Sequence, residues 1–409
     1  MNNLHPLFLS VNPNIISGYG QQTNEFGHRL VQSGLDIVFQ GRQWYGKPGI
    51  LVVPHRDGPR QYRMVGQEDV EFAPTPFTLS QYHMKAQQRN LFMSLWDIWD
   101  FGPEYAEIFK WVPYCPIDAP MTPKTYNTIK GCFDLIAMSK FGQKEFEKAG
   151  LESTYIPHGI DTSIFHPVSE DKKKEYRRKF GIPEDAFVIM TVGRNFYNRK
   201  RLDLMIQAFA TFIKKNKTED CYLSMHTERN TSPFNDSGDI PGSTNLIGFG
   251  YNLEEVAERF GIKDKVIFPN KFGTTIPAGL LAQKYCTADV YCSTSEAEGF
   301  NLCIVEAQAC GIPAIVPDNS AQPEHVEGHG WIVPCTDVIR LDNPHHPVWG
   351  TPDINKLVEA FEDAYNNRDK LKHFGEKADF YTKDKYDFNT IHEYHWLPFL
   401  KNLSRKIKT

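Results

Sequence analysis

The stretch SEAEGFNLCIVEAQACGIPAIV, residues 295–316, is the most distinctive part of this chain. Glu298 and Glu306 stand in it with seven residues between them, and the run closes on Cys-Gly-x-Pro. Apolar residues recur at helical spacing from about 301 to 310, and Gly311 followed by a proline is typical of a helix end. The pattern predicts a loop that carries Glu298 and a short helix that carries Glu306.

The start of this predicted helix is suited to an anion. The backbone N–H groups of Phe300, Asn301 and Leu302 have no partner inside a helix, so they can hold a phosphate group. A glutamate at a helix start can also merely offset the helix dipole, which accounts for one carboxylate. It does not account for Glu306 together with the Gly-Phe pair and the Cys-Gly-x-Pro stop.

Length and composition indicate an ordinary globular protein of two domains. The 409 residues exceed the roughly 250–300 that one core accommodates. The net charge of −5 argues against generic nucleic-acid binding. No CxxC pair occurs among the eight cysteines, so we expect reduced thiols, most of them buried, and no zinc or dithiol site.

Both ends of the chain bear on localisation. The first 14 residues lack a basic segment and a long apolar run, and no stretch of about 18 apolar residues occurs anywhere. We therefore expect a soluble, cytoplasmic protein without a transmembrane segment. The basic and aromatic run 388–409 either packs back on the body, which we favour, or makes a weak peripheral contact with a membrane surface.

Short β-rich runs alternate with helical patterns along the chain, which predicts parallel sheets with helical crossovers. The runs form two series, which lie near 7–11, 36–39, 50–53, 91–95, 111–114, 135–138 and 154–156, and near 187–192, 221–225, 266–268, 290–292, 314–316 and 331–333. The charged stretch 165–186 separates the series. Its basic residues form either a phosphate or lipid patch or, since acids interleave with them, a solvated helix face. We expect domains at 1–166 and 167–385 and a terminal segment at 386–409.

A glycine-containing turn follows the first predicted strand, in NPNIISGYGQQTNEF (12–26). Gly18 and Gly20 either let the backbone approach a phosphate at the next helix start or only make a tight turn. A dinucleotide fingerprint would have glycine where Thr23 stands and an acid near Gln40. A nicotinamide cofactor is therefore disfavoured.

A basic turn follows the strand FVIMTV, in GRNFYNRKRLDLMIQAF (193–209). Arg194 leaves the strand end and Lys200 precedes the next helical pattern. An arginine fork and a lysine point charge at the mouth of one such loop can converge on an anion. Surface solvation is the alternative for both.

These motifs together resemble the retaining glycosyltransferases of family four, which have the GT-B fold. SEAEGFNLCIVEAQACGIPAIV resembles their E-x7-E signature, and VGRNFYNRK resembles their Arg/Lys diphosphate clamp. IPHGIDTSIF (156–165) resembles the segment that ends their first domain, and LIAMSKFGQKEF and the glycine turn also have counterparts. The motifs come in the family's order and cover about residues 7–335.

The resemblance implies two facing Rossmann-like domains with a deep cleft between them. The second domain would bind a nucleotide-sugar donor, the first would supply the acceptor site, and the chain end would return to the first. The resemblance gives catalytic roles to Glu298, Arg194 and Lys200. It gives donor contacts to Gly18, Gly20, Arg194, Lys200, Asn270, Lys271, Ser295, Glu298, Gly299, Phe300, Asn301, Leu302 and Glu306.

Two residues depart from the family pattern. Asn301 stands where glycine is commoner, which would alter contact with the sugar, and His158 stands where asparagine is usual. Asp97 and Asp118 follow predicted strand ends in the first half. These two aspartates and His158 are candidates for the acceptor side, and capping or turn roles are an equal alternative for the aspartates.

The implied reaction moves a sugar from a UDP-, GDP- or ADP-sugar to a hydroxyl of a glycan, lipid, protein or small molecule, with retention of anomeric configuration. No D-x-D motif occurs, so we expect no essential metal and no cofactor beyond the donor. A sugar-nucleotide epimerase or hydrolase of the same fold, or a non-catalytic sugar-nucleotide-binding protein, is the alternative. The presence of both glutamates, the arginine and the lysine favours the transferase.

Overall fold

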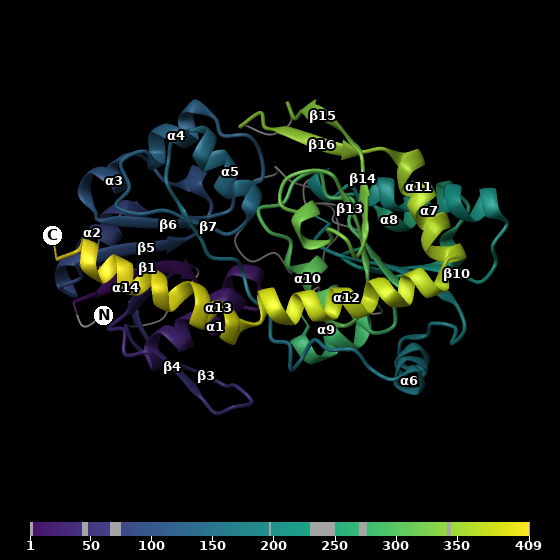
Figure 1. Cartoon of the computed structure of the whole chain (residues 1–409), viewed down its shortest axis with the longest axis horizontal. Helices are drawn as coiled ribbons and strands as arrows, with labels where there is room; N and C mark the ends of the chain where they lie inside the picture. Colours follow the sequence, from purple (N-terminus) through teal and green to yellow (C-terminus); the bar gives the residue numbers. More distant parts are fainter. Residues whose placement is uncertain are drawn as a thin grey trace. The chain divides into compact units, whose positions relative to one another are not determined.

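The computed structural model describes residues 3–42, 48–65, 75–195, 198–229, 250–269, 276–341 and 345–408. The chain folds into two compact units, shown in Figure 1. One comprises Met1–Gly159 with Tyr386–Thr409, and the other comprises Ile160–Lys385. Each unit has its own mainly parallel sheet with helical crossovers, so the predicted α/β fold class is confirmed.

The first unit has an eight-stranded sheet with the order β3-β4-β2-β1-β5-β6-β7-β8. Its strands are β1 (Pro6–Val11), β2 (Val38–Arg42), β3 (Gly49–Val53), β4 (Arg60–Val65), β5 (Leu91–Leu95), β6 (Trp111–Cys115), β7 (Ile136–Ala137) and β8 (Thr154–Tyr155). Its helices are α1 (Gly18–Gln32), α2 (Pro76–Ala86), α3 (Glu104–Ile108), α4 (Pro123–Ile129), α5 (Lys140–Lys148), α13 (Phe388–Ile391) and α14 (Leu397–Lys406). Every residue of β1, β5 and β6 is buried, as expected for parallel strands covered on both faces.

The C-terminal helices complete the first unit. Trp396 is fully buried, and its ring lies 5.8 Å from that of Tyr114 on β6. Asn3 donates a hydrogen bond to the Ser404 carbonyl at 2.8 Å, which ties the two ends of the chain together. The apolar side chains of α14 are buried in this unit: Phe399, Leu400 and Leu403 are at most 3% exposed.

The second unit has a six-stranded, wholly parallel sheet with the order β11-β10-β9-β12-β13-β14. Its strands are β9 (Phe187–Val192), β10 (Cys221–His226), β11 (Val266–Ile267), β12 (Val290–Cys292), β13 (Ala314–Pro317) and β14 (Trp331–Val333). Its helices are α6 (Glu170–Phe180), α7 (Leu202–Asn216), α8 (Leu253–Arg259), α9 (Ala278–Tyr285), α10 (Leu302–Ala309), α11 (Ile354–Asn366) and α12 (Arg368–Tyr386). A separate antiparallel ribbon consists of β15 (Cys335–Ile339) and β16 (Val348–Pro352).

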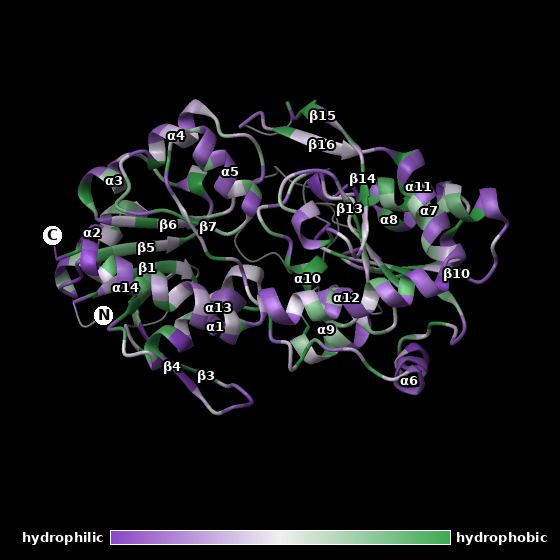
Figure 2. Cartoon of the chain, viewed as in Figure 1, coloured by the Kyte–Doolittle hydropathy of each residue, from purple (hydrophilic) through white to green (hydrophobic). Residues whose placement is uncertain are grey.

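Local sequence explains most of these elements. The run FVIMTV is almost wholly buried as the central strand β9, and α7 buries its apolar residues against the sheet. Helix α6 is hydrophilic along nearly its whole length (Figure 2). Five of its six basic residues pair with acids, and two of them, Arg177 and Lys173, contact Asp289 at 2.8 and 2.7 Å. The predicted charged helix is present, but Arg177 is buried and not solvated.

The structure corrects two points of the strand prediction. Strands β4, β15 and β16 were not predicted, because their sequences, RQYRMV, CTDVI and VWGTP, mix polar and apolar residues without a continuous buried run. The strand predicted near 50–53 does not belong to a parallel series, since β3 pairs antiparallel with β4. Among the residues described, no helix combines the length and the apolar character needed to cross a membrane.

Candidate functional site

Two segments of the second unit interlock at the carboxyl edge of its sheet, where ligands bind in open α/β folds. The first, residues 198–201, follows β9, and the second, residues 293–300, follows β12. The Glu296 N–H donates to the Arg199 carbonyl at 2.8 Å. The Thr294 hydroxyl donates to the Lys200 carbonyl at 2.9 Å. These bonds bring the basic turn and the glutamate loop together.

Glu298 lies at the centre of this junction. It is 7% exposed, and its carboxylate contacts the Lys200 ammonium and, at 3.1 Å, the Arg199 guanidinium. Burial acts to raise the pKa of Glu298, but the two cations outweigh burial and lower the pKa to about 2. Glu298 is therefore a carboxylate at neutral pH and cannot serve as a general acid.

Arg194, the predicted clamp arginine, has a different acidic partner. Its side chain is 66% exposed, and its Nε is 3.6 Å from a carboxylate oxygen of Glu228. The structure therefore adds Arg199 to Lys200 as a cation that contacts the Glu298 carboxylate. Arg199 was missed because the sequence pattern assigned one arginine and one lysine to the clamp, and Arg194 filled the arginine position.

Asn301 precedes the first residue of α10 and adopts a left-handed backbone conformation, with φ of 77°. Glycine adopts this conformation at the least cost, and asparagine tolerates it better than most residues. The Asn301 amide lies 3.2 Å from the Gln322 side-chain oxygen and 3.4 Å from the Ser293 hydroxyl, and both partners are buried. The backbone thus explains why glycine or asparagine stands here, and the Asn301 side chain is engaged within the protein.

The residues around Asn301 are buried and tightly connected. The Ser295 hydroxyl donates to the Ala297 carbonyl at 3.1 Å, Gly299 is buried, and Leu302 begins α10. The Phe300 carbonyl accepts a hydrogen bond from His325, with Nε2 and oxygen 2.6 Å apart, and the two rings meet edge to face. Burial lowers the pKa of His325 to about 4, so its imidazole is neutral when it donates.

Glu306 lies inside α10 and is 5% exposed. Its carboxylate accepts a hydrogen bond from the Tyr285 hydroxyl at 2.9 Å. Burial raises the pKa of Glu306 to about 7, and the Tyr285 hydrogen bond opposes this shift only in part. The two glutamates of the motif thus have opposite environments: Glu298 faces cations and Glu306 faces a phenol.

The glycine turn of the first unit has a structural explanation. A Cβ atom on Gly20 would lie 2.0 Å from the Ile15 carbonyl oxygen, so only glycine fits. Ser17 caps α1 by accepting a hydrogen bond from the Gly20 N–H at 3.1 Å. Gly18 is the first residue of the helix. The tight-turn reading therefore accounts for Gly20 without a ligand.

The acceptor-side candidates lie in two places. The Tyr19 hydroxyl donates a hydrogen bond to Asp97 at 3.0 Å. Burial raises the pKa of Tyr19, and the charge of Asp97 and, more weakly, that of Asp118 raise it further. Both carboxylates therefore lie near the Tyr19 phenol. His158 instead shares a hydrogen bond of 2.8 Å with the buried Tyr114 hydroxyl, and burial lowers the pKa of His158 to about 3. His158 is thus a neutral histidine of the core.

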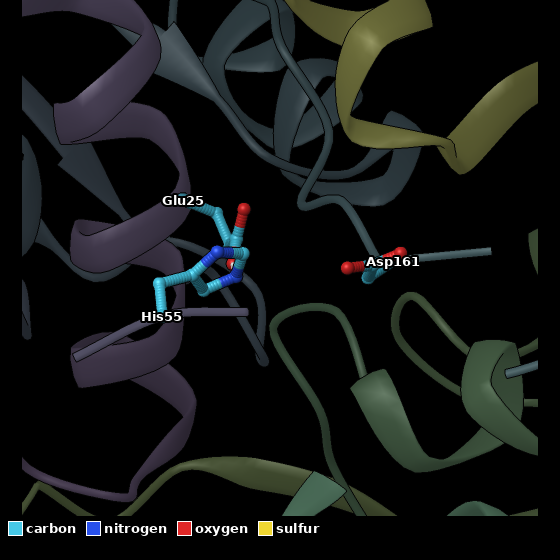
Figure 3. A group of neighbouring side chains, drawn as sticks. All are labelled: Glu25, His55 and Asp161. Carbon is cyan, nitrogen blue, oxygen red and sulfur yellow. Dashed lines mark ion pairs between the residues drawn. The ribbon is translucent and has the colours of Figure 1, made fainter. Parts of the chain in front are cut away.

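A further carboxylate of the first unit is held by cations. Glu25 on α1 contacts Arg29 at 2.7 Å and Arg60 at 2.9 Å. His55, drawn beside Glu25 in Figure 3, has its Nε2 3.6 Å from a Glu25 carboxylate oxygen. Burial and the Arg60 charge lower the pKa of His55. Asp161, the third residue drawn, belongs to the second unit, where it accepts a hydrogen bond from the Ser163 N–H at 3.0 Å. Asn270 and Lys271, two of the predicted donor contacts, lie outside the described residues.

The part of the chain that holds these residues is similar to known proteins. Residues 186–342 match the family model described as glycosyl transferases group 1. Residues 186–342 are thus similar to the group 1 glycosyltransferases. The matched range contains the basic turn, the glutamate loop and α10, so the resemblance drawn from residues 295–316 is confirmed.

One relative is a D-inositol 3-phosphate glycosyltransferase of Geodermatophilus obscurus, 31% identical over 160 residues, which cover 39% of this chain and 31% of the relative. The chain thus spans about a third of the length of the first curated relatives it matches. Two solved structures match nearly the whole chain. Sucrose-phosphate synthase from Thermosynechococcus elongatus has a TM-score of 0.71 at 16% identity, covering 98% of this chain and 100% of its own. Anabaena HepE in complex with UDP-glucose has a TM-score of 0.66 at 15% identity, with the same coverage. The fold is GT-B.

Proposed function

We propose that this protein is a retaining glycosyltransferase that moves a sugar from a nucleoside-diphosphate sugar to an acceptor hydroxyl. One observation carries the proposal: Arg199, Lys200 and Glu298 meet at the carboxyl edge of the sheet, directly before the start of α10. Two cations and a helix start favour a diphosphate. A carboxylate beside them is suited to the hydroxyls of a sugar attached to that diphosphate.

The proposed chemistry requires positioning and charge stabilisation. Breaking the bond between the sugar and the diphosphate places negative charge on the leaving phosphate oxygen and gives the sugar oxocarbenium character. Lys200 and Arg199 stabilise that leaving oxygen in this proposal, and Arg194 joins them when the donor is bound. The acceptor attacks from the face that the diphosphate leaves and passes its proton to the leaving phosphate, which retains the configuration.

The two glutamates have separate roles in this scheme. Glu298, ionised and next to the cations, accepts hydrogen bonds from the transferred sugar. Glu306 accepts hydrogen bonds from the ribose, and its raised pKa makes that contact sensitive to pH near neutrality. The amides of Phe300, Asn301 and Leu302 hold the diphosphate, and Ser295 and Gly299 shape their loop. Because two side-chain cations are available, we propose that no metal is required.

The acceptor side belongs to the first unit in this proposal. Asp97 and Asp118 lie beside Tyr19 at the carboxyl ends of β5 and β6, where an acceptor hydroxyl can be hydrogen-bonded. His158 is buried, so we assign it support of β6 through Tyr114. Gly18 and Gly20 are assigned the turn that positions Tyr19.

A donor panel tests the proposal. UDP-, GDP- and ADP-sugars are screened by thermal shift for binding and by nucleotide release for turnover, with and without a set of sugar, polyol and lipid acceptors. UDP-glucose is the first donor because the HepE structure holds it. We expect one donor class to bind and to release nucleotide only when an acceptor is present; if no donor binds, the proposal is wrong.

The same panel separates the alternatives. The pKa values of Glu298 and Glu306 differ by several units, which is also the pattern of a hydrolase pair with one acid and one carboxylate. A hydrolase would release sugar and nucleotide without an acceptor, and an epimerase would convert the donor without releasing nucleotide. A non-catalytic binding protein would bind a donor and turn over none.

A further inference from the structure

Glu296 is a second buried glutamate in the same loop, two residues before Glu298. It is fully buried, and one of its carboxylate oxygens is the common partner of three side chains. Arg201 contacts this oxygen at 2.8 Å, the Thr351 hydroxyl donates to it at 2.6 Å, and Arg340 also contacts it. Nothing in the E-x7-E pattern or the proposed chemistry uses this residue.

Two of these partners come from the β15–β16 ribbon. Arg340 directly follows β15 and Thr351 lies on β16, so two residues of the ribbon contact the Glu296 carboxylate. The Gly350 N–H on β16 also donates to the Glu296 carbonyl at 3.2 Å. A Cβ atom on Gly350 would lie 2.9 Å from Asn319, so the ribbon packs against the residues that follow β13. Figure 1 shows this ribbon at the end of the sheet where β13 and β14 finish.

The other partner comes from the basic turn. Arg201 occupies the N-cap position of α7 in a left-handed conformation, with φ of 43°, and its guanidinium donates two hydrogen bonds to the Asp203 carboxylate, at 3.0 and 3.1 Å. Glu296 itself donates its backbone N–H to the Arg199 carbonyl. Glu296 therefore joins three segments: the glutamate loop, the turn that carries Arg199 and Lys200, and the ribbon.

Removing one partner from a buried ion pair leaves an uncompensated charge, so such a network holds its segments firmly only while it is complete. Groups that bind or react with a substrate must be held within about 0.5 Å by the residues that support them. Glu298 and the cations that face it stand on the two segments that Glu296 connects. The ribbon is thus bonded, through Glu296, to both segments that carry the pair placed on the donor in the proposed function.

We propose that Glu296 is a positioning residue of the donor site and that the β15–β16 ribbon, through Arg340 and Thr351, is part of that site. This inference rests on the proposed function, because it assigns the ribbon an effect on donor binding. The network acts through the loop backbone.

Variants of the ribbon test the proposal without altering the site itself. Arg340→Met removes one charge from the network, Thr351→Val removes one hydroxyl, and Arg340→Lys keeps the charge. Asp337→Asn is the matched control, since it changes an exposed charged residue on β15. Affinity for UDP, GDP and ADP is measured by calorimetry on the full chain, with unfolding followed in parallel.

We expect the nucleotide that binds the unaltered protein to bind Arg340→Met at least 10-fold more weakly and Thr351→Val about 3-fold more weakly. Arg340→Lys should recover most of the loss, and Asp337→Asn should not differ. A purely structural role would lower the unfolding midpoint of Arg340→Met and leave nucleotide affinity unchanged, which would overturn the inference. If none of the three nucleotides binds the unaltered protein, the proposed function fails instead.

Hydrogen exchange gives a readout that does not depend on a ligand. In Arg340→Met, peptides covering residues 293–301 should exchange at least 10-fold faster than in the unaltered protein, and peptides from α7 beyond its first turn should not change. Arg340→Lys should again resemble the unaltered protein. Equal exchange in the 293–301 peptides of Arg340→Met and the unaltered protein would overturn the inference, whatever the protein binds.

Discussion

Replacing Glu298 by glutamine should change the acid stability of the protein in a way that its contacts determine. The carboxylate is buried against Lys200 and Arg199, and its pKa is about 2 in the folded chain, against an ordinary value of 4.5. A difference of this size corresponds to roughly 3 kcal/mol of stability at pH 7. The glutamine variant should lose approximately that amount and leave the two cations without a counter-charge.

The pH dependence follows from the direction of the shift. Because the pKa of Glu298 is lowered on folding, the contribution of its carboxylate to the free energy of unfolding is fully present above about pH 4.5 and is lost as the pH falls towards 2. The stability difference between the unaltered protein and Glu298→Gln should therefore shrink by about 2 kcal/mol between pH 7 and pH 3. Glutamine does not titrate, so other acids affect both proteins alike.

Urea unfolding at a series of pH values measures this difference, with circular dichroism and tryptophan fluorescence as independent probes. Glu255→Gln provides a control, because Glu255 is half-exposed and pairs with Arg259 on the surface of α8. We expect that variant to differ by less than about 1 kcal/mol at any pH. A stability difference for Glu298→Gln that stays constant from pH 7 to pH 3 would refute the account of this ion pair.

Four further predictions follow from the site. In urea unfolding, the free energy of unfolding of Asn301→Gly should lie within about 1 kcal/mol of that of the unaltered protein. Asn301→Ala should be about 1–2 kcal/mol less stable, because alanine keeps the strain of the left-handed conformation and loses the amide contacts. Equal stability of the two variants would contradict this. Donor affinity by calorimetry should rise between pH 6 and pH 8 as Glu306 ionises, by up to about 10-fold, and Glu306→Gln should flatten the profile; a slope that survives in Glu306→Gln would assign it to another group. His325→Phe should keep an aromatic ring but lose the hydrogen bond to the Phe300 carbonyl, which lowers the free energy of unfolding by about 1–3 kcal/mol. An unchanged unfolding midpoint would show that this hydrogen bond does not stabilise the protein. Excess EDTA should leave nucleotide release unchanged, and loss of turnover that Mg²⁺ restores would show a metal requirement.

The parallel core and the glutamate loop were predictable because they leave strong local signals. Strand β9 is a continuous buried run, and α10 has helical spacing with a glycine stop. In contrast, β15 and β16 are short, half-exposed and antiparallel, so their pairing depends on contacts that no local pattern encodes.

Within the site, the sequence predicted residue types better than their partners. Lys200 and Glu298 were both named, but their direct contact joins residues almost a hundred positions apart. Arg199 was missed because Arg194 filled the arginine position of the pattern, and Glu296 was missed because charged residues in loops are usually solvated. Only the tertiary structure shows that both side chains have partners inside the protein. The backbone conformation of Asn301, which explains its departure from glycine, is likewise visible only in the structure.

A nucleoside diphosphate bound by the cations that face Glu298 is detected by calorimetric titration of UDP, GDP and ADP into the unaltered protein and into Lys200→Met. We expect one of the three nucleotides to bind the unaltered protein and to bind Lys200→Met at least 10-fold more weakly. Equal affinity in the two proteins, or no binding of any nucleotide to the unaltered protein, would contradict it.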